Sequence, residues 1–235
     1  MKLFSWINKS NDITDKRAGD NPTFQVHVNI IDSFNNLINE NIKERLKTNG
    51  YKKKALTFYK KDKELVYVIN FQKSQGNSDE QLKFYINCGI YSALIDKTID
   101  KPGLLEPKEY ECHYRVRIST LINSKEDGYK IDRLTDLESF TLKLSDDLGI
   151  VLNHFDNYKS TLDLINLMID YNSLDYSLFD YVVLTGDDFH LRKQVNKIYE
   201  LWSSESRWTR IKNDLNSRLK EHHKKQTIEE IIDNK

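Results

Sequence analysis

Residues 82–91, LKFYINCGIY, form the most regular stretch of the sequence. Apolar side chains occupy every second position, and side chains of mixed character lie between them. Successive side chains of a β-strand point to opposite faces of a sheet, so this alternation predicts a strand with one buried face. The predicted buried face carries Leu82, Phe84, Ile86, Cys88 and Ile90. The opposite face carries Lys83, Tyr85, Asn87, Gly89 and Tyr91.

Three neighbouring segments also predict strands. Residues 55–59 and 65–71 are rich in β-branched and aromatic residues, and a polar break of hairpin length, residues 60–64, separates them. Residues 112–119 follow the central stretch and alternate again between apolar and polar side chains. The sequence therefore predicts a small antiparallel sheet of about four strands.

Helical periodicity flanks these strands on both sides. Apolar residues recur at spacings of three and four between residues 30 and 48, and Gly50 follows, a residue suited to the left-handed conformation that ends a helix. The same spacing returns at residues 134–157. Both segments are amphipathic, so we expect them to cover one face of the sheet. The predicted fold class is α+β.

The remainder of the chain is predicted to be helical. Residues 176–184 fit a strand or a helix by periodicity, and the turn at 186–188, which leads into another helical stretch, favours a helix. We expect a flexible lead-in at residues 1–22, an α+β domain at 23–157, a helical C-terminal segment at 158–223 and a frayed tail at 224–235.

Composition argues against several classes of protein. The chain has 36 Lys and Arg residues and 36 Asp and Glu residues, so it lacks the overall positive charge typical of proteins that bind nucleic acids or membranes. No glycine-rich phosphate-binding motif occurs. No stretch approaches the roughly 20 apolar residues of a membrane span, and the apolar run near the N-terminus is too short for a signal peptide. We expect a cytoplasmic protein.

The two cysteines are expected to be free thiols. Two cysteines provide neither a metal quartet nor a disulfide scaffold. Cys88 and Cys112 occupy apolar positions of their strands, which places both on one face of the sheet, beneath the helices. Cys112 and His113 are adjacent in a strand and would point to opposite faces, which argues against a Cys–His nucleophile pair.

No metal site and no cofactor are expected. Asp187, Asp188 and His190 have metal-binding side chains, but they lie where a helix begins, and acidic residues there cap the helix and interact favourably with its dipole. His222 and His223 have no acidic residue or cysteine arranged beside them as a further ligand.

The face of the predicted sheet opposite the apolar side chains is the main candidate site. If the three longest strands are neighbours, their polar side chains project together. A guanidinium group offers a planar fork of donors to a carboxylate or phosphate, and amides can complete the hydrogen bonds around such an anion. The alternative is an ordinary solvated face of an antiparallel sheet. The candidate residues are Asn70, Gln72, Tyr85, Asn87, His113, Arg115 and Arg117.

Several short motifs resemble a bacterial family, domain of unknown function 4304. They are GYKK at 50–53, FY at 58–59, VINFQKS at 68–74, FYINCGI at 84–90 and CHYRVRI at 112–118. Their order and spacing carry the resemblance, which covers roughly residues 28–155. The resemblance implies no established activity, cofactor or catalytic residue.

Three functions remain open. The first is a small bacterial protein that binds a protein partner through the Arg/Asn face, for example as an immunity or defence-accessory factor. The second is an enzyme or a small-anion binder centred on Asn70, Asn87, His113, Arg115 and Arg117. The third is nucleic-acid binding by the lysine-rich first hairpin, which the neutral charge balance disfavours and for which protection of an edge strand is the alternative. The absence of a catalytic motif favours binding over catalysis.

Overall fold

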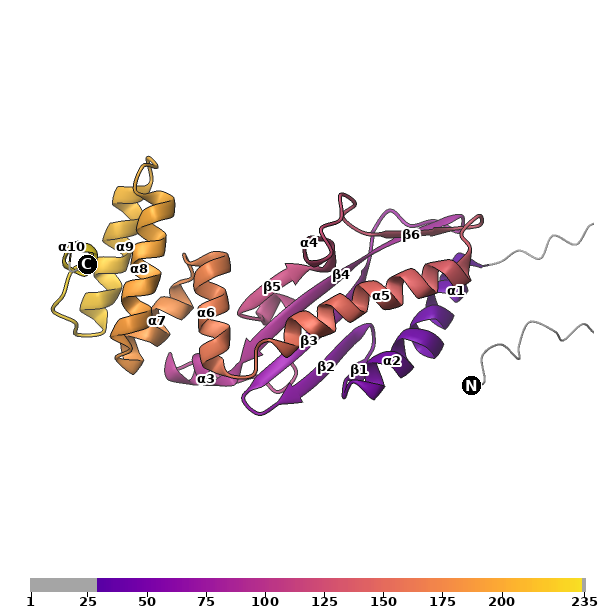
Figure 1. Ribbon diagram of the computed structural model, residues 1–235, viewed down its shortest axis with the longest axis horizontal. Helices are drawn as coiled ribbons and strands as arrows, with labels where there is room; N and C mark the ends of the chain where they lie inside the picture. Colours follow the sequence, from indigo (N-terminus) through magenta and orange to yellow (C-terminus); the bar gives the residue numbers. More distant parts are fainter. Residues whose placement is uncertain (1–28, 234–235) are drawn as a thin grey trace, which may run out of the picture.

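A six-stranded antiparallel sheet with helices on one face forms one half of the molecule, and a group of helices forms the other half (Figure 1). The computed structural model describes residues 29–233, so the lead-in predicted at residues 1–22 lies outside the described part. The strands follow the order β1-β2-β3-β4-β5, and β6 also pairs with β4. They are β1 (Lys52–Lys54), β2 (Thr57–Asp62), β3 (Leu65–Lys73), β4 (Gln81–Ser92), β5 (Tyr114–Arg117) and β6 (Tyr129–Asp132). The predicted α+β class is confirmed.

Two strands escape the sequence analysis because neighbouring strands hold them in the sheet. β1 consists of three lysines and has no apolar residue, yet it pairs with β2, with Lys52 opposite Tyr59. β6 has four residues and pairs with the first part of β4. β2 also continues to Asp62, through the polar break predicted at residues 60–64, because its lysines pair with the apolar start of β3.

The helices on one face of the sheet enclose an aromatic core. They are α1 (Ile30–Asn36), a π-helical turn η1 (Leu37–Ile42), α2 (Lys43–Thr48) and α5 (Leu137–Asp156). Phe84 of β4 contacts Phe34 of α1 edge-on, with ring centres 5.0 Å apart, and stacks on Tyr129 of β6 at 5.4 Å. Phe140 of α5 approaches the same Phe84 ring at 6.3 Å. The Phe84 side chain therefore contacts α1, α5 and β6.

The alternation predicted for residues 82–91 is confirmed. Its apolar positions are all fully buried against the helices: Leu82, Phe84, Ile86, Cys88 and Ile90. In the register, Cys88 lies opposite Ile69 of β3 and Val116 of β5, and Asn87 lies opposite Asn70 and Arg117. Polar positions of three strands therefore share the second face, which we call the outer face.

The connection from β4 to β5 covers one half of the outer face. It contains α3 (Ala93–Thr98) and a short 3-10 helix, η2 (Glu109–Glu111). Tyr91 fixes its course, because its hydroxyl donates to Asp96 at 2.6 Å and accepts from the backbone N–H of Leu104 at 2.8 Å. Tyr91 also belongs to a second, smaller buried cluster with Val66, Val68 and Cys112.

Cys112 lies on the opposite face of the sheet from Cys88, so the register predicted for Cys112 is wrong. β5 begins at Tyr114, and the strand alternation does not extend back to Cys112, which follows η2. Gly89 leaves the space that Cys112 fills on the outer face. Both cysteines are nevertheless buried free thiols, as predicted, and burial raises the pKa of each thiol.

The C-terminal half consists of five helices among the described residues, and they share one apolar core with the sheet. Residues 176–184 are helical, as predicted, and the Asp187 side chain caps α8 by accepting from the backbone N–H of His190 at 3.1 Å. The tail predicted from residue 224 contains a helix whose Ile228 and Ile231 are buried. The helices are α6 (Thr161–Asn172), α7 (Tyr176–Thr185), α8 (Asp188–Trp202), α9 (Trp208–Glu221) and α10 (Ile228–Asp233).

A chain of hydrogen bonds joins α6 to the end of the sheet. Thr161 donates to the Glu64 carboxylate at 2.8 Å, and its hydroxyl oxygen lies 2.7 Å from that of Ser92. Ser92 also accepts from the backbone N–H of Leu94 and thereby caps α3. The same two hydroxyl groups therefore hold α3 and α6 at one end of β4.

We predict that both thiols are protected in the native protein. A thiol reagent should label Cys88 and Cys112 far more slowly under native conditions than in denaturant, because both sulfur atoms are buried and both pKa values are raised. A cysteine placed at the exposed Ser204 (Ser204→Cys) gives the rate for an accessible thiol. Native labelling of Cys112 at that rate would contradict the packing on Gly89.

Gly89→Ala should destabilise the fold by about 1–3 kcal/mol, the usual cost of overpacking. The added Cβ would lie 2.7 Å from the sulfur and 2.8 Å from the Cβ of Cys112. Gly76→Ala is the matched control, since a Cβ there has no atom within 4 Å, and its effect should stay within about 0.5 kcal/mol. Urea unfolding measures both, and equal free energies of unfolding for the two variants would refute the tight contact.

Candidate functional site

A row of polar side chains crosses the open half of the outer face. The strand register aligns Thr57, Asn70, Asn87 and Arg117 across β2, β3, β4 and β5. The amide of Asn70 donates to the Thr57 hydroxyl at 2.8 Å. The amide of Asn87 donates to the Gln72 side-chain oxygen at 2.8 Å. These bonds fix the orientation of the amides, and we call this row, with Gln72 and Tyr85, the polar row.

Arg117 lies at the end of the polar row and is held from two sides. Its guanidinium group stacks over the Tyr85 ring, 4.6 Å from the ring centre, and donates a hydrogen bond to the Asp127 carboxylate. The hydrogen bond lowers the pKa of Asp127 and raises the pKa of Arg117. Both side chains remain open to solvent, with 43% of Arg117 and 58% of Asp127 exposed.

Arg115 shares the outer face with Arg117 and also holds a carboxylate. Its Nε donates to Glu109 of η2 at 3.0 Å. The two arginines lie two residues apart on β5, so they project from the same face at a spacing of about 7 Å. Each therefore binds an acidic side chain supplied by a different loop of the same protein.

His113 is separated from the other candidate residues. Its ring stacks on Tyr91 at 5.0 Å and lies buried at the covered half of the outer face. Nδ1 accepts from the backbone N–H of Ser92 at 3.2 Å, which leaves Nε2 to donate to Asp96 at 3.3 Å. Burial raises the pKa of Asp96, but the hydrogen bonds from His113 and Tyr91 outweigh burial and hold the pKa below its ordinary value. His113 thus holds α3 in place.

The structure therefore brings together five of the seven candidate residues around the polar row, and it places Arg115 beside them and His113 elsewhere. The candidate residues that meet are Asn70, Gln72, Tyr85, Asn87 and Arg117. Three further residues of the site, Glu109, Asp127 and Thr57, are not predicted by the sequence. No periodic signal marks the two acids, because both lie in irregular connections between strands.

The lysine-rich hairpin engages several of its charges within the molecule. Lys54 pairs with Glu106 at 2.5 Å, and Lys53 donates to Asn39 of η1 at 2.8 Å. The ammonium group of Lys60 lies 5.9 Å from the centres of the Tyr51 and Tyr67 rings. β1 forms an edge of the sheet, where lysine discourages pairing with other chains.

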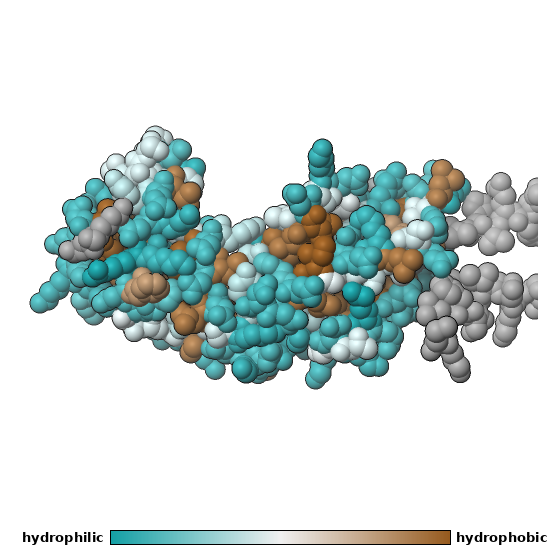
Figure 2. All heavy atoms as spheres, in the orientation of Figure 1, coloured by the Kyte–Doolittle hydropathy of each residue, from teal (hydrophilic) through white to brown (hydrophobic). Residues whose placement is uncertain are grey.

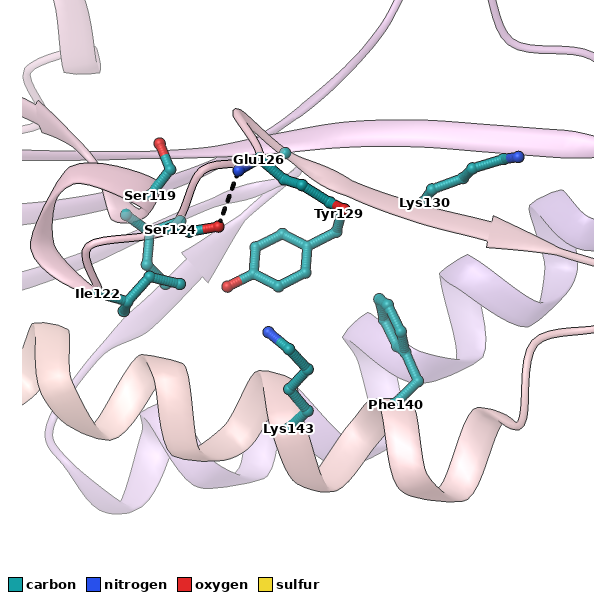
Figure 3. A pocket seen from close by; sticks show the side chains of 10 residues that line it. Ser119, Ile122, Ser124, Glu126, Tyr129, Lys130, Phe140 and Lys143 are labelled. Atoms are coloured by element: carbon teal, nitrogen blue, oxygen red, sulfur yellow. Dashed lines mark hydrogen bonds between the residues drawn. The ribbon is translucent and has the colours of Figure 1, made fainter.

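A cavity lies between β6, α5 and the short helix α4 (Ile118–Leu121). Figure 3 shows the Tyr129 ring and the Lys143 side chain approaching each other across this cavity. Both donate to the same carboxylate oxygen of Asp147, each at 2.8 Å. Burial is the main cause that raises the pKa of Tyr129 far above its ordinary value, and the hydrogen bond from Tyr129 to Asp147 is the second. The phenol therefore keeps its proton. The cavity lies on the helix-covered side of the sheet, away from the polar row.

Within residues 29–233, no three His, Cys, Asp or Glu side chains gather in a way that could hold a metal ion. None of the helices in that range combines the length and the apolar character needed to cross a membrane.

Comparison with known proteins links the sheet to one family. Residues 42–153 match the model of the family described as Domain of unknown function (DUF4304). This match confirms the resemblance inferred from the motifs. It begins at the end of η1 and ends within α5, so it contains all six strands, the polar row and the cavity, whereas α6–α10 lie beyond it. Comparisons with curated proteins and with solved structures found no match.

Arg117→Gln should raise the pKa of Asp127 towards the ordinary value of about 3.9, because the hydrogen bond that lowers it is lost. In the wild type, the lowered pKa of Asp127 means that the ion pair stabilises the folded protein at pH values above the unfolded-state pKa of Asp127. This stabilisation is lost as the pH falls through the lower pKa that Asp127 has in the folded state. Carboxyl NMR titration measures the shift. The pKa of Asp132, which Thr135 lowers, should not move, and an unchanged Asp127 would contradict the pairing.

Proposed function

We propose that the protein binds an acidic segment of a partner protein through the outer face, with Arg115 and Arg117 as the main contacts. One observation carries this proposal: each arginine already holds a carboxylate, that of Glu109 or that of Asp127, in a position that a partner's carboxylate could take. Guanidinium groups at this spacing can contact one acidic group or two neighbouring ones.

The polar row supports exchange of the internal carboxylate for an external one. The Arg117–Asp127 pair is exposed, and exposed pairs contribute little to stability, so its replacement costs little. Tyr85 still holds the Arg117 guanidinium when Asp127 leaves, because the ring contact does not involve the carboxylate. The neighbouring amides of Asn70 and Asn87 are already oriented by their own hydrogen bonds. The arginine site is therefore prepared before a partner arrives.

The arrangement favours binding over catalysis. An enzyme centred on the same residues would use His113 as the acid or base, but that ring is buried against Tyr91 and bonded to Ser92 and Asp96. The other candidate residues are amides, arginines and an aromatic ring, which recognise groups and do not transfer protons readily near neutral pH. A cytoplasmic location is part of the proposal, since free thiols persist in a reducing compartment.

The test uses a fluorescent hexaglutamate peptide at low salt. Changing both arginines (Arg115→Gln and Arg117→Gln) should weaken binding at least tenfold with little change in melting temperature, and added salt should weaken binding to the wild type. The matched control changes Arg207→Gln and Arg210→Gln, two exposed arginines at the start of α9, and should bind as the wild type does.

Removing an internal carboxylate should have the opposite effect on hexaglutamate binding from removing the arginines. Asp127→Asn should strengthen hexaglutamate binding, because it removes the group that competes for Arg117. Glu126→Gln, the neighbouring acid of the same loop, removes an equal charge without freeing Arg117 and should strengthen binding less. Failure of the wild type to bind, or equal binding by the wild type and the double arginine variant, would refute the proposed function.

A further inference from the structure

The cavity between β6, α4 and α5 has the size of a small ring. Its volume is about 160 Å³. An engineered apolar cavity of about 150 Å³ in another protein binds benzene, so this volume admits a single six-membered ring. The residues that line the cavity are Ile118, Ser119, Ile122, Ser124, Glu126, Gly128, Tyr129, Lys130, Phe140 and Lys143.

The apolar part of the cavity wall comes from separate elements, and serines and charged side chains form the rest of it. Ile118 and Ile122 come from α4 and its end, and Phe140 comes from α5. Figure 2 shows hydrophobic residues gathered over α4 and the adjoining part of α5. Gly128 fixes the rim, because its backbone packs so closely on β4 that an added Cβ would lie 2.7 Å from the carbonyl oxygen of Phe84. The ring-sized space therefore has a fixed position.

Two polar groups project into the same space. Figure 3 shows the Tyr129 hydroxyl and the Lys143 ammonium group reaching into the gap between β6 and α5. Each donates to Asp147, which leaves further N–H donors on Lys143 and lone pairs on the Tyr129 oxygen for a ligand. A ligand oxygen between them could accept from Lys143 and, as a hydroxyl, donate to Tyr129.

The charges around the cavity select against a charged ligand. Asp147 balances Lys143 at 2.8 Å, and the lining contains one further base, Lys130, and one further acid, Glu126. An anion would approach Asp147 and Glu126, and a cation would approach Lys143 and Lys130. Either would also lose hydration beside a group of its own sign.

We propose that this cavity binds an uncharged monocyclic aromatic molecule that carries one hydroxyl or carbonyl group. The ring lies between Ile122 and Phe140, and the oxygen meets Lys143 and Tyr129. The site is separate from the outer face, so the proposal does not depend on the proposed binding of an acidic partner.

Three probes with the same ring test the ligand chemistry: phenol, benzoate and benzylamine. Amide NMR spectra of the full chain should show phenol shifting the residues of α4, the following loop and the first turns of α5. Benzoate and benzylamine should bind at least threefold more weakly, because each brings a charge that loses hydration beside a lining group of the same sign. Equal binding by the three probes, or phenol shifts scattered over the molecule, would overturn the proposal.

Variants of the lining residues test the location. Ser119→Phe fills the cavity from α4 and should abolish the phenol shifts, whereas Ser204→Phe, the same change at an exposed turn, should leave them intact. Lys143→Met keeps the aliphatic stem and removes the donor, so it should weaken phenol several-fold and leave toluene unchanged. Ile122→Trp replaces Ser119→Phe if the latter does not fold, and phenol shifts that persist in the folded filled variant would refute the site.

Discussion

The pairing of β4 with its neighbours is the constraint on which the rest of the structure depends. β4 is 12 residues long and pairs with β3 along one edge and with β5 and β6 along the other. A slip of one residue would exchange the two faces of the strand and expose its five buried apolar side chains. Burying each large apolar side chain is worth roughly 1.5–3 kcal/mol, so the register is strongly fixed. The same register aligns Asn87 with Asn70 and Arg117.

Where a strand has a buried face, the sequence is sufficient to predict its orientation. The alternation in residues 82–91 correctly assigns both faces of β4, and with them the positions of Tyr85 and Asn87. Alternation no longer gives the side-chain direction past the end of a strand, as at Cys112, because the turn at η2 changes that direction. Alternation also gives no signal at β1, whose lysines become a strand only by pairing with β2.

The sequence predicts the basic side chains of the candidate site but not its acidic side chains. Arg115 and Arg117 follow from the period of β5, whereas Glu109 and Asp127 reach them from irregular segments whose course depends on tertiary contacts. One such contact is the close packing of Gly128 on β4, beside Asp127. The seclusion of His113 has a similar origin, because the hydrogen bonds of Tyr91 and Asp96 determine the path of the covering connection.

The loop at residues 123–128 contributes side chains both to the end of the polar row and to the cavity beside α5. Asp127 reaches Arg117 on the outer face, while Ser124, Glu126 and Gly128 line the cavity beside α5. Asn123, with a φ of 52°, begins the loop, and the tight contact of Gly128 on β4 ends it. A ligand of the cavity that shifts this loop therefore changes the affinity of the arginine site for its partner. The partner changes the affinity of the cavity for its ligand by the same factor. A ligand that leaves the loop in place does not change the affinity at the other site.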